Sequence, residues 1–340
     1  MEEASTIINN CHVPLLENRN ADLVNDQDAI PYTDCIFQQP WWLDAVAPGR
    51  YEAVEVKVDG KVRARLPYVV RTTLGVKVIT MPLLTPYLGP WFAPSNAKYV
   101  NQLGEQKELL NELIDQLPPH DYFVQSCHHS FKNWLPFYWR NFKASTSYTF
   151  IFEKLGNLNK VWNGIRTKTR GQIRKAMRQL VVRPGEDIDE FLKLAADSFA
   201  RRGLVLSKGF LEVGKRIDAA CAPRKARQMF FAEDAKGQVH AAIYNVLDNN
   251  CVYALMAGEN AELRDSAGAS LVAWESLKFA AATGRNFDFC GSTIESIEKF
   301  LRGFGGELRP YFIISRLSRR GRVMMAGKEL LNRLQRNRHR

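Results

Sequence analysis

The chain has 340 residues, of which 46% are hydrophobic, and a net charge of +11. This length allows two domains of ordinary size, and no apolar run approaches the roughly 18 residues that a membrane span needs. The first ten residues, MEEASTIINN, are acidic and polar, unlike a signal peptide, so we expect a cytoplasmic protein.

Cysteine spacing gives no sign of a metal centre. Six cysteines are spread along the chain without a CxxC pair or another ligand spacing, which argues against a metal site or a disulfide framework. Cys251 and Cys290 fall in predicted strands, where a free cysteine behaves as a small apolar residue. We therefore expect no metal.

The charge is unevenly distributed. Residues 316–340 and residues 160–183 each contribute +8, whereas residues 1–36 contribute −6. Such patterning points to anionic partners more strongly than a uniformly basic composition would.

The first half of the chain has the pattern of a small α/β unit. Two alternating runs flank Asp59-Gly60 and predict a β-hairpin. The loop TPYLGPWFAP, residues 85–94, is either an apolar plug over a core or the wall of a pocket. The other expected elements are a short helix after Pro40, a strand at VKVITMP (76–82), a helix at 105–117, and strands at 122–126 and 147–152.

A basic helix is expected to begin near Asn159 and to run to about residue 180. Arg166, Arg170, Arg174 and Arg178 recur every four residues on it, so they would form one ridge. Like charges at this spacing cost roughly 0.2–0.5 kcal/mol per pair, and no acid is near in the sequence. The ridge therefore either binds an anionic substrate or nucleic acid, or is a solvated or sheet-covering face.

The second half predicts an antiparallel meander that leads into a helix and a further strand. Helices at 187–200 and 209–222 precede strands at 227–232, 239–247 and 251–257. A polar loop at 258–266, a helix at 267–283, a strand at 286–290 and a helix opened by Gly291-Ser292 follow. The order of the first half repeats this loosely, so we expect two similar α/β (α+β) halves.

Three segments carry a resemblance to a known superfamily. They are IRTKTRGQIRKAMRQL (165–180), GASLVAWESLKFAAATGRNFDFCGS (268–292) and EKFLRGFGGELRPY (298–311). Their order resembles the GNAT acyltransferase fold, and their details resemble its Fem-type branch: the FemABX-like peptidoglycan aminoacyltransferases and Fem-like acetyltransferases. FQQPWWLDAV and TPYLGPWF are similar to the family's first domain.

The resemblance implies two tandem GNAT-like domains, each a mixed, mostly antiparallel sheet flanked by helices. We expect the N-terminal domain at 1–145, the Fem-type domain at 146–315 and a basic tail helix at 316–340. Two positions depart from the family. Leu301 stands where the Fem-type ending has a lysine, and Ala267 stands at the first glycine of the GNAT donor-binding pattern.

The candidate donor site is the register Arg264-Asp265-Ser266-Ala267-Gly268-Ala269. Backbone N–H groups at a helix N-terminus can bind a pyrophosphate. The resemblance therefore implies acyl-CoA, most plausibly acetyl-CoA, as the donor, with contacts from the segment Arg264, Ser266, Ala267, Gly268 and Ala269.

Acyl transfer also needs groups that move protons and polarise a carbonyl. Asp288, Glu295 and Arg302 would form an acceptor-side cluster, and Tyr253 is either a general acid or a residue at the core edge. Ser292 and Glu295 also match a capping box, and Arg302 could simply pair with Glu298. The expected substrate contacts are Arg166, Arg170, Arg174, Ser292, Lys299 and Tyr311.

The leading hypothesis is an N-acyltransferase that acts on an amino group of a cell-envelope glycan or peptidoglycan-type precursor. One alternative is aminoacyl transfer from aminoacyl-tRNA, with the arginine ridge and the tail contacting phosphates. Another is a non-catalytic GNAT-fold binding module. The helix expected at 321–337 could touch RNA, lie on the inner face of a membrane, or pack on the protein. Oligomeric state is left open.

Overall fold

The computed structural model describes residues 30, 33, 35–73, 75–200 and 207–322. The chain forms two compact units: unit 1 comprises Met1–Val46 and Tyr148–Pro310, and unit 2 comprises Ala47–Ser147 and Tyr311–Arg340. The sequence placed all of residues 1–145 in the first domain, whereas the described residues up to Val46 group with unit 1. The two units are described separately below.

Unit 1 contains a mixed sheet with strand order β6-β11-β10-β9-β8-β7. All neighbours are antiparallel except β10 and β11, which are parallel. Its strands are β6 (Lys143–Phe152, from Tyr148 onward), β7 (Val181–Gly185), β8 (Arg227–Glu233), β9 (Val239–Leu247), β10 (Cys251–Glu259), β11 (Asn286–Asp288) and the first residues of β12 (Glu307–Leu317).

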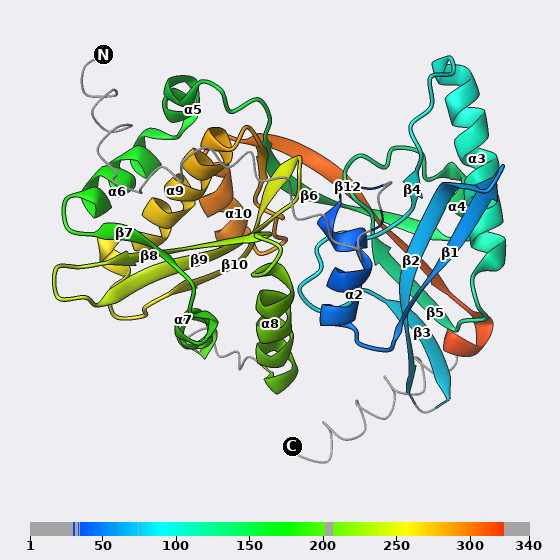
Figure 1. The fold of residues 1–340 in the computed structure, drawn as a ribbon, viewed down its shortest axis with the longest axis horizontal. Coiled ribbons are helices and arrows are strands. Elements are labelled where there is room, and N and C mark those ends of the chain that lie inside the picture. The colour runs from blue at the N-terminus through cyan, green and yellow to red at the C-terminus, as the bar shows by residue number, and fades with distance from the viewer. Residues whose placement is uncertain (1–29, 31–32, 34, 74, 201–206, 323–340) are drawn as a thin grey trace, which may run out of the picture. The chain divides into compact units, whose positions relative to one another are not determined.

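Helices cover both faces of this sheet. Figure 1 shows α6 and α9 on one side and α7 on the other. The helical elements are η1 (Ile36–Gln38), α2 (Pro40–Val46), α5 (Leu158–Gly164), α6 (Thr167–Met177), α7 (Ile188–Ala200), α8 (Lys208–Cys221), η2 (Arg264–Ser266), α9 (Gly268–Ala282) and α10 (Glu295–Arg302).

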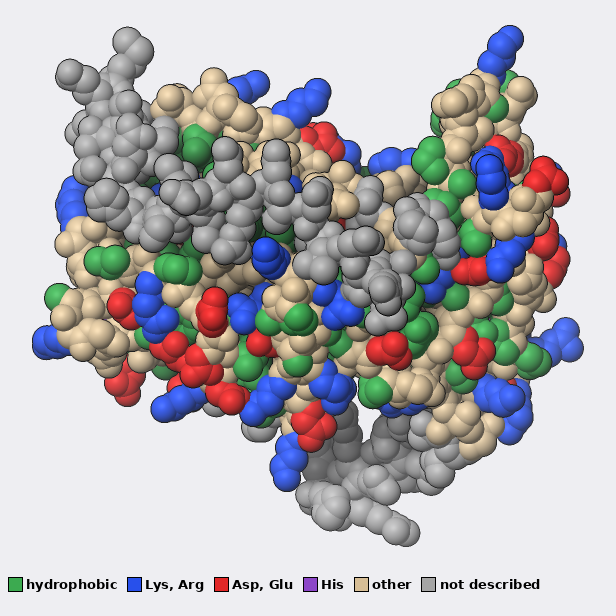
Figure 2. Space-filling model, in the orientation of Figure 1, with side chains coloured by type: hydrophobic (Ala, Val, Ile, Leu, Met, Phe, Trp, Pro, Cys, Tyr) green, Lys and Arg blue, Asp and Glu red, His purple; other side chains and the backbone are tan. Residues whose placement is uncertain are grey.

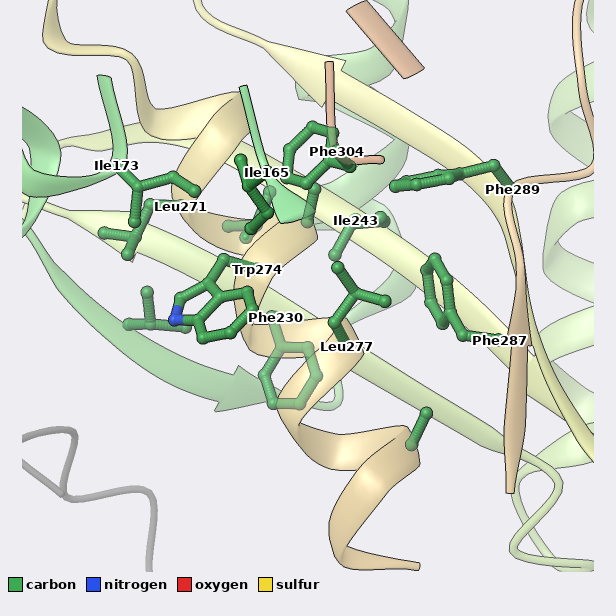
Figure 3. Packing of buried hydrophobic residues seen from close by; sticks show 14 of the residues in the cluster. Ile165, Ile173, Phe230, Ile243, Leu271, Trp274, Leu277, Phe287, Phe289 and Phe304 are labelled. Atoms are coloured by element: carbon green, nitrogen blue, oxygen red, sulfur yellow. The ribbon is translucent and has the colours of Figure 1, made fainter. Parts of the chain in front are cut away.

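The core of unit 1 surrounds α9. Trp274 and Leu277 of α9 are fully buried and belong to one hydrophobic cluster with Phe230 of β8 and Ile243 of β9 (Figure 3). Ile173 of α6 belongs to the same cluster. Because α9 is apolar on nearly every side, it is a central buried helix rather than a surface helix with one apolar stripe.

Unit 2 contains a second mixed sheet, with strand order β1-β2-β3-β5-β12 and β4 paired to β2. Its core lies between these strands and the helices α3 and α4, and includes the buried residues Leu66, Leu113, Phe123 and Phe137. Its elements are β1 (Tyr51–Val58), β2 (Lys61–Thr73), β3 (Val76–Thr80), β4 (Trp91–Phe92), α3 (Tyr99–Gln116), β5 (Tyr122–Ser126), α4 (Leu135–Trp139) and the second part of β12.

The surface of unit 2 exposes apolar side chains on α3 and α4, some of which are visible in Figure 2. Tyr99, Val100, Tyr138 and Trp139 are each more than half exposed. Lys107 lies 5.7 Å above the ring of Trp139. These side chains are scattered over two helices and are a normal feature of a protein surface.

The predicted fold class is confirmed. Each unit is a mixed, mostly antiparallel sheet flanked by helices, and the hairpin at Asp59-Gly60 joins β1 to β2. Within the described residues, no helix is long and apolar enough to cross a membrane. Most of the expected tail helix, 321–337, lies outside the described residues.

The predicted long basic helix is wrong in one respect, since it consists of two helices. The chain leaves the helical conformation at Ile165, after α5, and re-enters it at Thr167. Arg166 donates its backbone N–H to the carbonyl of Gly303 at 2.9 Å. A Cβ on Gly305 would lie 2.4 Å from the carbonyl oxygen of Gly164. These contacts with a loop 140 residues away break the helix, and local sequence could not reveal them.

Candidate functional site

The candidate donor site lies in unit 1, at the corner where β10 leads into α9. β10 pairs with β11 only from Cys251 to Tyr253, because β11 ends at Asp288. β10 continues to Glu259, and a bulge interrupts its ladder with β9 between Ala254 and Met256. Among the described strands, the second half of β10 therefore has a neighbour on one side only.

The corner turns through a left-handed residue. Ala267 has φ 61° and ψ 30°, and α9 begins at the next residue, Gly268. Left-handed backbone costs an L-residue about 1–2 kcal/mol relative to the right-handed form. Ala267 thus adopts the conformation for which the GNAT pattern has a glycine, although it is not one.

Gly268 is tightly packed at the start of α9. A Cβ at this position would lie 3.1 Å from the Cβ of Ala241 and 3.3 Å from that of His240, both on β9. The start of the helix is therefore held close against the sheet. Gly268 N–H donates to Ser266 Oγ at 3.3 Å.

The N-terminus of α9 can accept an anion. Its N-cap residue, Ala267, makes no side-chain capping hydrogen bond, so the next N–H groups are not satisfied in that way. They combine with the helix dipole to attract negative charge. Ala269, the second residue of α9, is half-buried at this end.

Arg264 is already engaged at this corner. Its Nε donates to Glu259 Oε2 at 2.9 Å. Glu262 and Asp265 are exposed on the same loop. The five residues of the predicted donor segment are thus brought together, but the loop itself brings more negative than positive charge.

The second corner follows β11 and holds Asp288. This carboxylate is fully buried, and its Oδ1 accepts hydrogen bonds from Thr149 Oγ1 on β6 and from Cys290 N–H, the latter at 2.7 Å. Cys290 has φ 57°, and a Cβ on Gly291 would lie 2.0 Å from the carbonyl oxygen of Tyr148. Asp288 therefore braces a tight turn.

Tyr253 is also internal. Its hydroxyl donates to Asp248 Oδ2 at 3.1 Å, its ring lies 4.9 Å from that of Phe37, and burial raises its pKa well above the usual value. Asp248 additionally accepts the N–H groups of Ile36, Asn250 and Cys251. Burial raises the pKa of Asp248 to about 6. The interpretation of Tyr253 as a residue of the core edge fits these contacts.

The predicted capping box is wrong. α10 begins at Glu295 with Ile294 as its N-cap, and Ser292 Oγ instead accepts the N–H of Ile294 at 3.1 Å. Ser292 is one turn too early to cap the helix, because it closes a local turn. Glu295 is exposed at the first residue of α10, and Lys299 is exposed one turn further along.

Arg302 and Leu301 lie on different faces of α10. Arg302 Nε donates to Glu298 Oε1 at 2.8 Å, the ion pair that the spacing indicated. Leu301 is buried in the core cluster with Phe304. The position where Fem-type proteins have a lysine is therefore a packing position in this chain.

The α6 arginines are not one continuous helical ridge. Arg166 is the N-cap residue of α6. Arg170 Nη2 donates to Thr167 Oγ1 at 3.4 Å, and the guanidinium of Arg174 lies 5.5 Å above the ring of Trp162. None of the three forms an ion pair with a carboxylate of the described residues.

Tyr311 is the first residue of the other unit, so it does not join the group in unit 1. There its ring lies 5.2 Å from that of Tyr87, which in turn lies 5.4 Å from His128. Desolvation, helped by Lys132, lowers the pKa of His128 to about 4. Tyr87 and Leu88 are buried, so this part of the TPYLGPWFAP loop is an apolar plug.

Sequence reasoning missed several residues that build these corners. Thr149 and Asp248 had no signal beyond a strand and a turn, because their partners are far away in the chain. Gln179, which contacts the donor corner, also carried none. Within 35–73, 75–200 and 207–322, no group of three or more His, Cys, Asp or Glu is arranged to hold a metal ion.

Comparison with known proteins identifies the domain. Residues 165–296 match the family model "Acetyltransferase (GNAT) domain", a range that includes α6, the meander and both corners. No curated protein sequence matches significantly.

Solved structures share the fold over most of the chain. FemX is 13% identical, covering 82% of this chain and 92% of its own, with a TM-score of 0.61. The C-terminal domain (DUF2156) of a putative lysylphosphatidylglycerol synthetase from Agrobacterium fabrum is 11% identical, covering 88% and 95%, with a TM-score of 0.52. A tandem GNAT protein from the clavulanic acid biosynthesis pathway is 9% identical, covering 81% and 86%, with a TM-score of 0.48.

The fold and the family model define a GNAT-fold acyltransferase. The chain belongs to the GNAT superfamily and has the Fem-type fold, as its motifs predicted.

Proposed function

We propose that the protein is an acyl-CoA-dependent N-acyltransferase, with acetyl-CoA as its donor. The observation that carries this proposal is the left-handed Ala267 that opens α9 within the GNAT-matched region. The residue is not the glycine of the family pattern, yet its backbone makes the same turn and leaves the α9 N-terminus without a side-chain cap. This geometry suits the pyrophosphate of a CoA donor.

The proposed acceptor is an amino group of a cell-envelope glycan or peptidoglycan-type precursor. The likeness of the fold to FemX supports this choice. In the reaction, the neutral amine attacks the thioester carbonyl carbon, the carbon–sulfur bond breaks, and the thiolate takes up a proton while the new amide nitrogen loses one. Glu295 is exposed at the start of α10, so we assign it the role of accepting that proton.

Aminoacyl-tRNA is the alternative donor. The guanidiniums of Arg170 and Arg174, which have no carboxylate partner among the described residues, favour a phosphate-rich ligand. A membrane or RNA contact through 321–340 is a separate proposal, and most of that segment lies outside the described residues.

The Ala269→Asp substitution tests the donor site. It puts a carboxylate at the second residue of α9, where it would repel a pyrophosphate while favouring the helix by about 0.3–1 kcal/mol. We expect unchanged or raised thermal stability, together with loss of acetyl-CoA binding in isothermal titration calorimetry.

The matched control is Gly209→Asp, which adds the same charge at the second residue of α8. A Cβ at Gly209 has only Ser207 Oγ within 4 Å, at 3.8 Å. Acetyl-CoA affinity should be unchanged in this control. Wild-type protein that binds aminoacyl-tRNA and not acetyl-CoA would favour the alternative donor. A lack of binding to either would favour a non-catalytic module.

A further inference from the structure

The loop that precedes α9 is poorly suited to a highly charged donor. Residues 259–266 carry Glu259, Glu262 and Asp265 against the single Arg264. Because Arg264 is paired with Glu259, two exposed carboxylates remain beside a helix end that must accept phosphate. The compensating positive charge must come from another element.

The end of α6 lies against this loop. Gln179, just after α6, donates from Nε2 to the carbonyl oxygen of Ser266 at 3.3 Å. Ala176 and Leu180 anchor the same end of the helix in the core cluster that contains Leu271 of α9. α6 is therefore the basic element that the structure brings to the donor corner.

Two cations occupy this end of α6. Lys175 and Arg178 are exposed, and neither forms an ion pair with a carboxylate in the described part of the chain. At 100° per residue, Lys175 lies about 40° around the helix from Gln179, whereas Arg174 lies about 140° from it. Lys175 thus shares the flank that contacts the loop.

The arginines nearer the start of α6 point elsewhere. Arg174 is held over Trp162 of α5, and Arg170 contacts Thr167. The basic face expected from the sequence therefore divides into two flanks. One, with Arg170 and Arg174, is directed toward α5. The other, formed by Lys175 and Arg178, lies beside the donor corner.

We propose that Lys175 and Arg178 bind the 3′-phosphate of the acyl-CoA donor. This inference rests on the proposed function, which assigns the donor's pyrophosphate to the N-terminus of α9. The 3′-phosphate is carried by the same nucleotide and has no other cation available on the acid-rich loop. Lysine and arginine both bind phosphate through charge-assisted hydrogen bonds.

The experiment compares two donors that differ in this group alone, acetyl-CoA and acetyl-3′-dephospho-CoA. Wild-type protein should bind acetyl-CoA at least about tenfold more tightly, since two charge-assisted contacts are gained. In Lys175→Glu/Arg178→Glu the preference should disappear, through weaker binding of acetyl-CoA alone. Dissociation constants from isothermal titration calorimetry measure both effects.

The control variant is Lys193→Glu/Lys208→Glu. It makes the same charge change at two exposed lysines of α7 and α8, and should retain the wild-type preference. If the charge-reversed variant unfolds, Lys175→Gln/Arg178→Gln replaces it, with thermal unfolding as the check on folding.

The outcomes separate this inference from the proposed function. Wild-type protein that binds neither CoA derivative contradicts the proposed function. Equal affinity of wild-type protein for the two donors, or an equal loss for both in the α6 variant, overturns the assignment of the 3′-phosphate and leaves acyl-CoA dependence intact.

Discussion

The two corners of unit 1 use the same backbone device for opposite purposes. Each joins a strand to a helix through a left-handed residue that is not glycine, Ala267 with φ 61° and Cys290 with φ 57°. At the first corner the helix begins at once and its N-terminus has no side-chain cap. At the second, four further residues intervene before α10, and the buried Asp288 carboxylate binds Thr149 and Cys290.

The difference shows which corner is built to receive a ligand. Donors that are left unsatisfied at a helix end can bind an anion, whereas a carboxylate that already accepts two internal hydrogen bonds serves the fold. We therefore call the α9 corner open and the β11–α10 corner closed. The predictions below test this contrast, beginning with the largest effect.

Gly291→Ala should be the most damaging change at the closed corner. The new Cβ would lie 2.0 Å from the Tyr148 carbonyl oxygen, at a residue with φ 64°. Left-handed strain and overpacking together predict a loss of about 3–5 kcal/mol in the free energy of unfolding. Gly284→Ala is the control, because Gly284 has φ 68° and no atom within 4 Å of such a Cβ. It should lose about 1 kcal/mol. Urea denaturation measures both, and equal losses would mean that the closed corner can relax.

Asp248 gives β10 a pH dependence at the end away from the open corner. Burial raises its folded-state pKa to about 6, against about 3.9 when unfolded. The folded state thus favours the protonated form. The stability this provides is complete below about pH 4, is lost as the pH rises to about 6, and amounts to about 3 kcal/mol.

Asp248→Asn should remove that dependence. The unfolding free energy of the wild type, minus that of the variant, should fall by about 3 kcal/mol between pH 4 and pH 7. Asp44→Asn changes an exposed acid of α2 and serves as the control. A constant difference for Asp248→Asn over this range would contradict the assigned pKa.

Asp288 separates bracing from catalysis. Asp288→Ala leaves the buried donors of Thr149 and Cys290 unsatisfied and should cost about 2–3 kcal/mol of stability. Asp288→Asn keeps an oxygen acceptor, so it should cost about 1 kcal/mol or less and leave kcat within about threefold. A stable Asp288→Asn variant with a hundredfold lower kcat would instead support the catalytic role that the sequence suggested.

Arg302→Ala should have the smallest effect on stability. The Glu298–Arg302 pair is exposed on α10, and such pairs contribute about 0.3–0.5 kcal/mol. A larger change in the KM of the acceptor than in stability would assign Arg302 to acceptor binding. Wild-type kinetics would leave it a surface ion pair.

Local pattern was enough to predict most of the elements. The strand Val239–Leu247 was predicted with its observed bounds, and α9 was predicted to within one residue at each end, because apolar runs bounded by turn residues are local signals. The registers of the sheets could not be predicted in this way, since they depend on partners elsewhere in the chain.

The candidate site was predicted less completely. The donor segment was located because its residues are consecutive, but alanine gives no sign that it will adopt a left-handed conformation. Asp288 was expected to face a substrate because its partner, Thr149, lies 139 residues earlier in the chain. The two basic flanks of α6 became distinct only when Trp162 and Ser266 were known to lie beside them.

The division of the chain between the units has a consequence for biosynthesis. The Ile36 N–H bonds to Asp248 across 212 residues, and the partner of β5 in unit 2 is the last strand, β12. On the ribosome, residues 47–147 emerge first, without that strand, so β5 must wait as an unpaired sheet edge for about 170 residues of further synthesis. Such edges are prone to intermolecular pairing. Slow or interrupted translation beyond residue 150 is therefore the step at which we expect the nascent protein to depend most on chaperones.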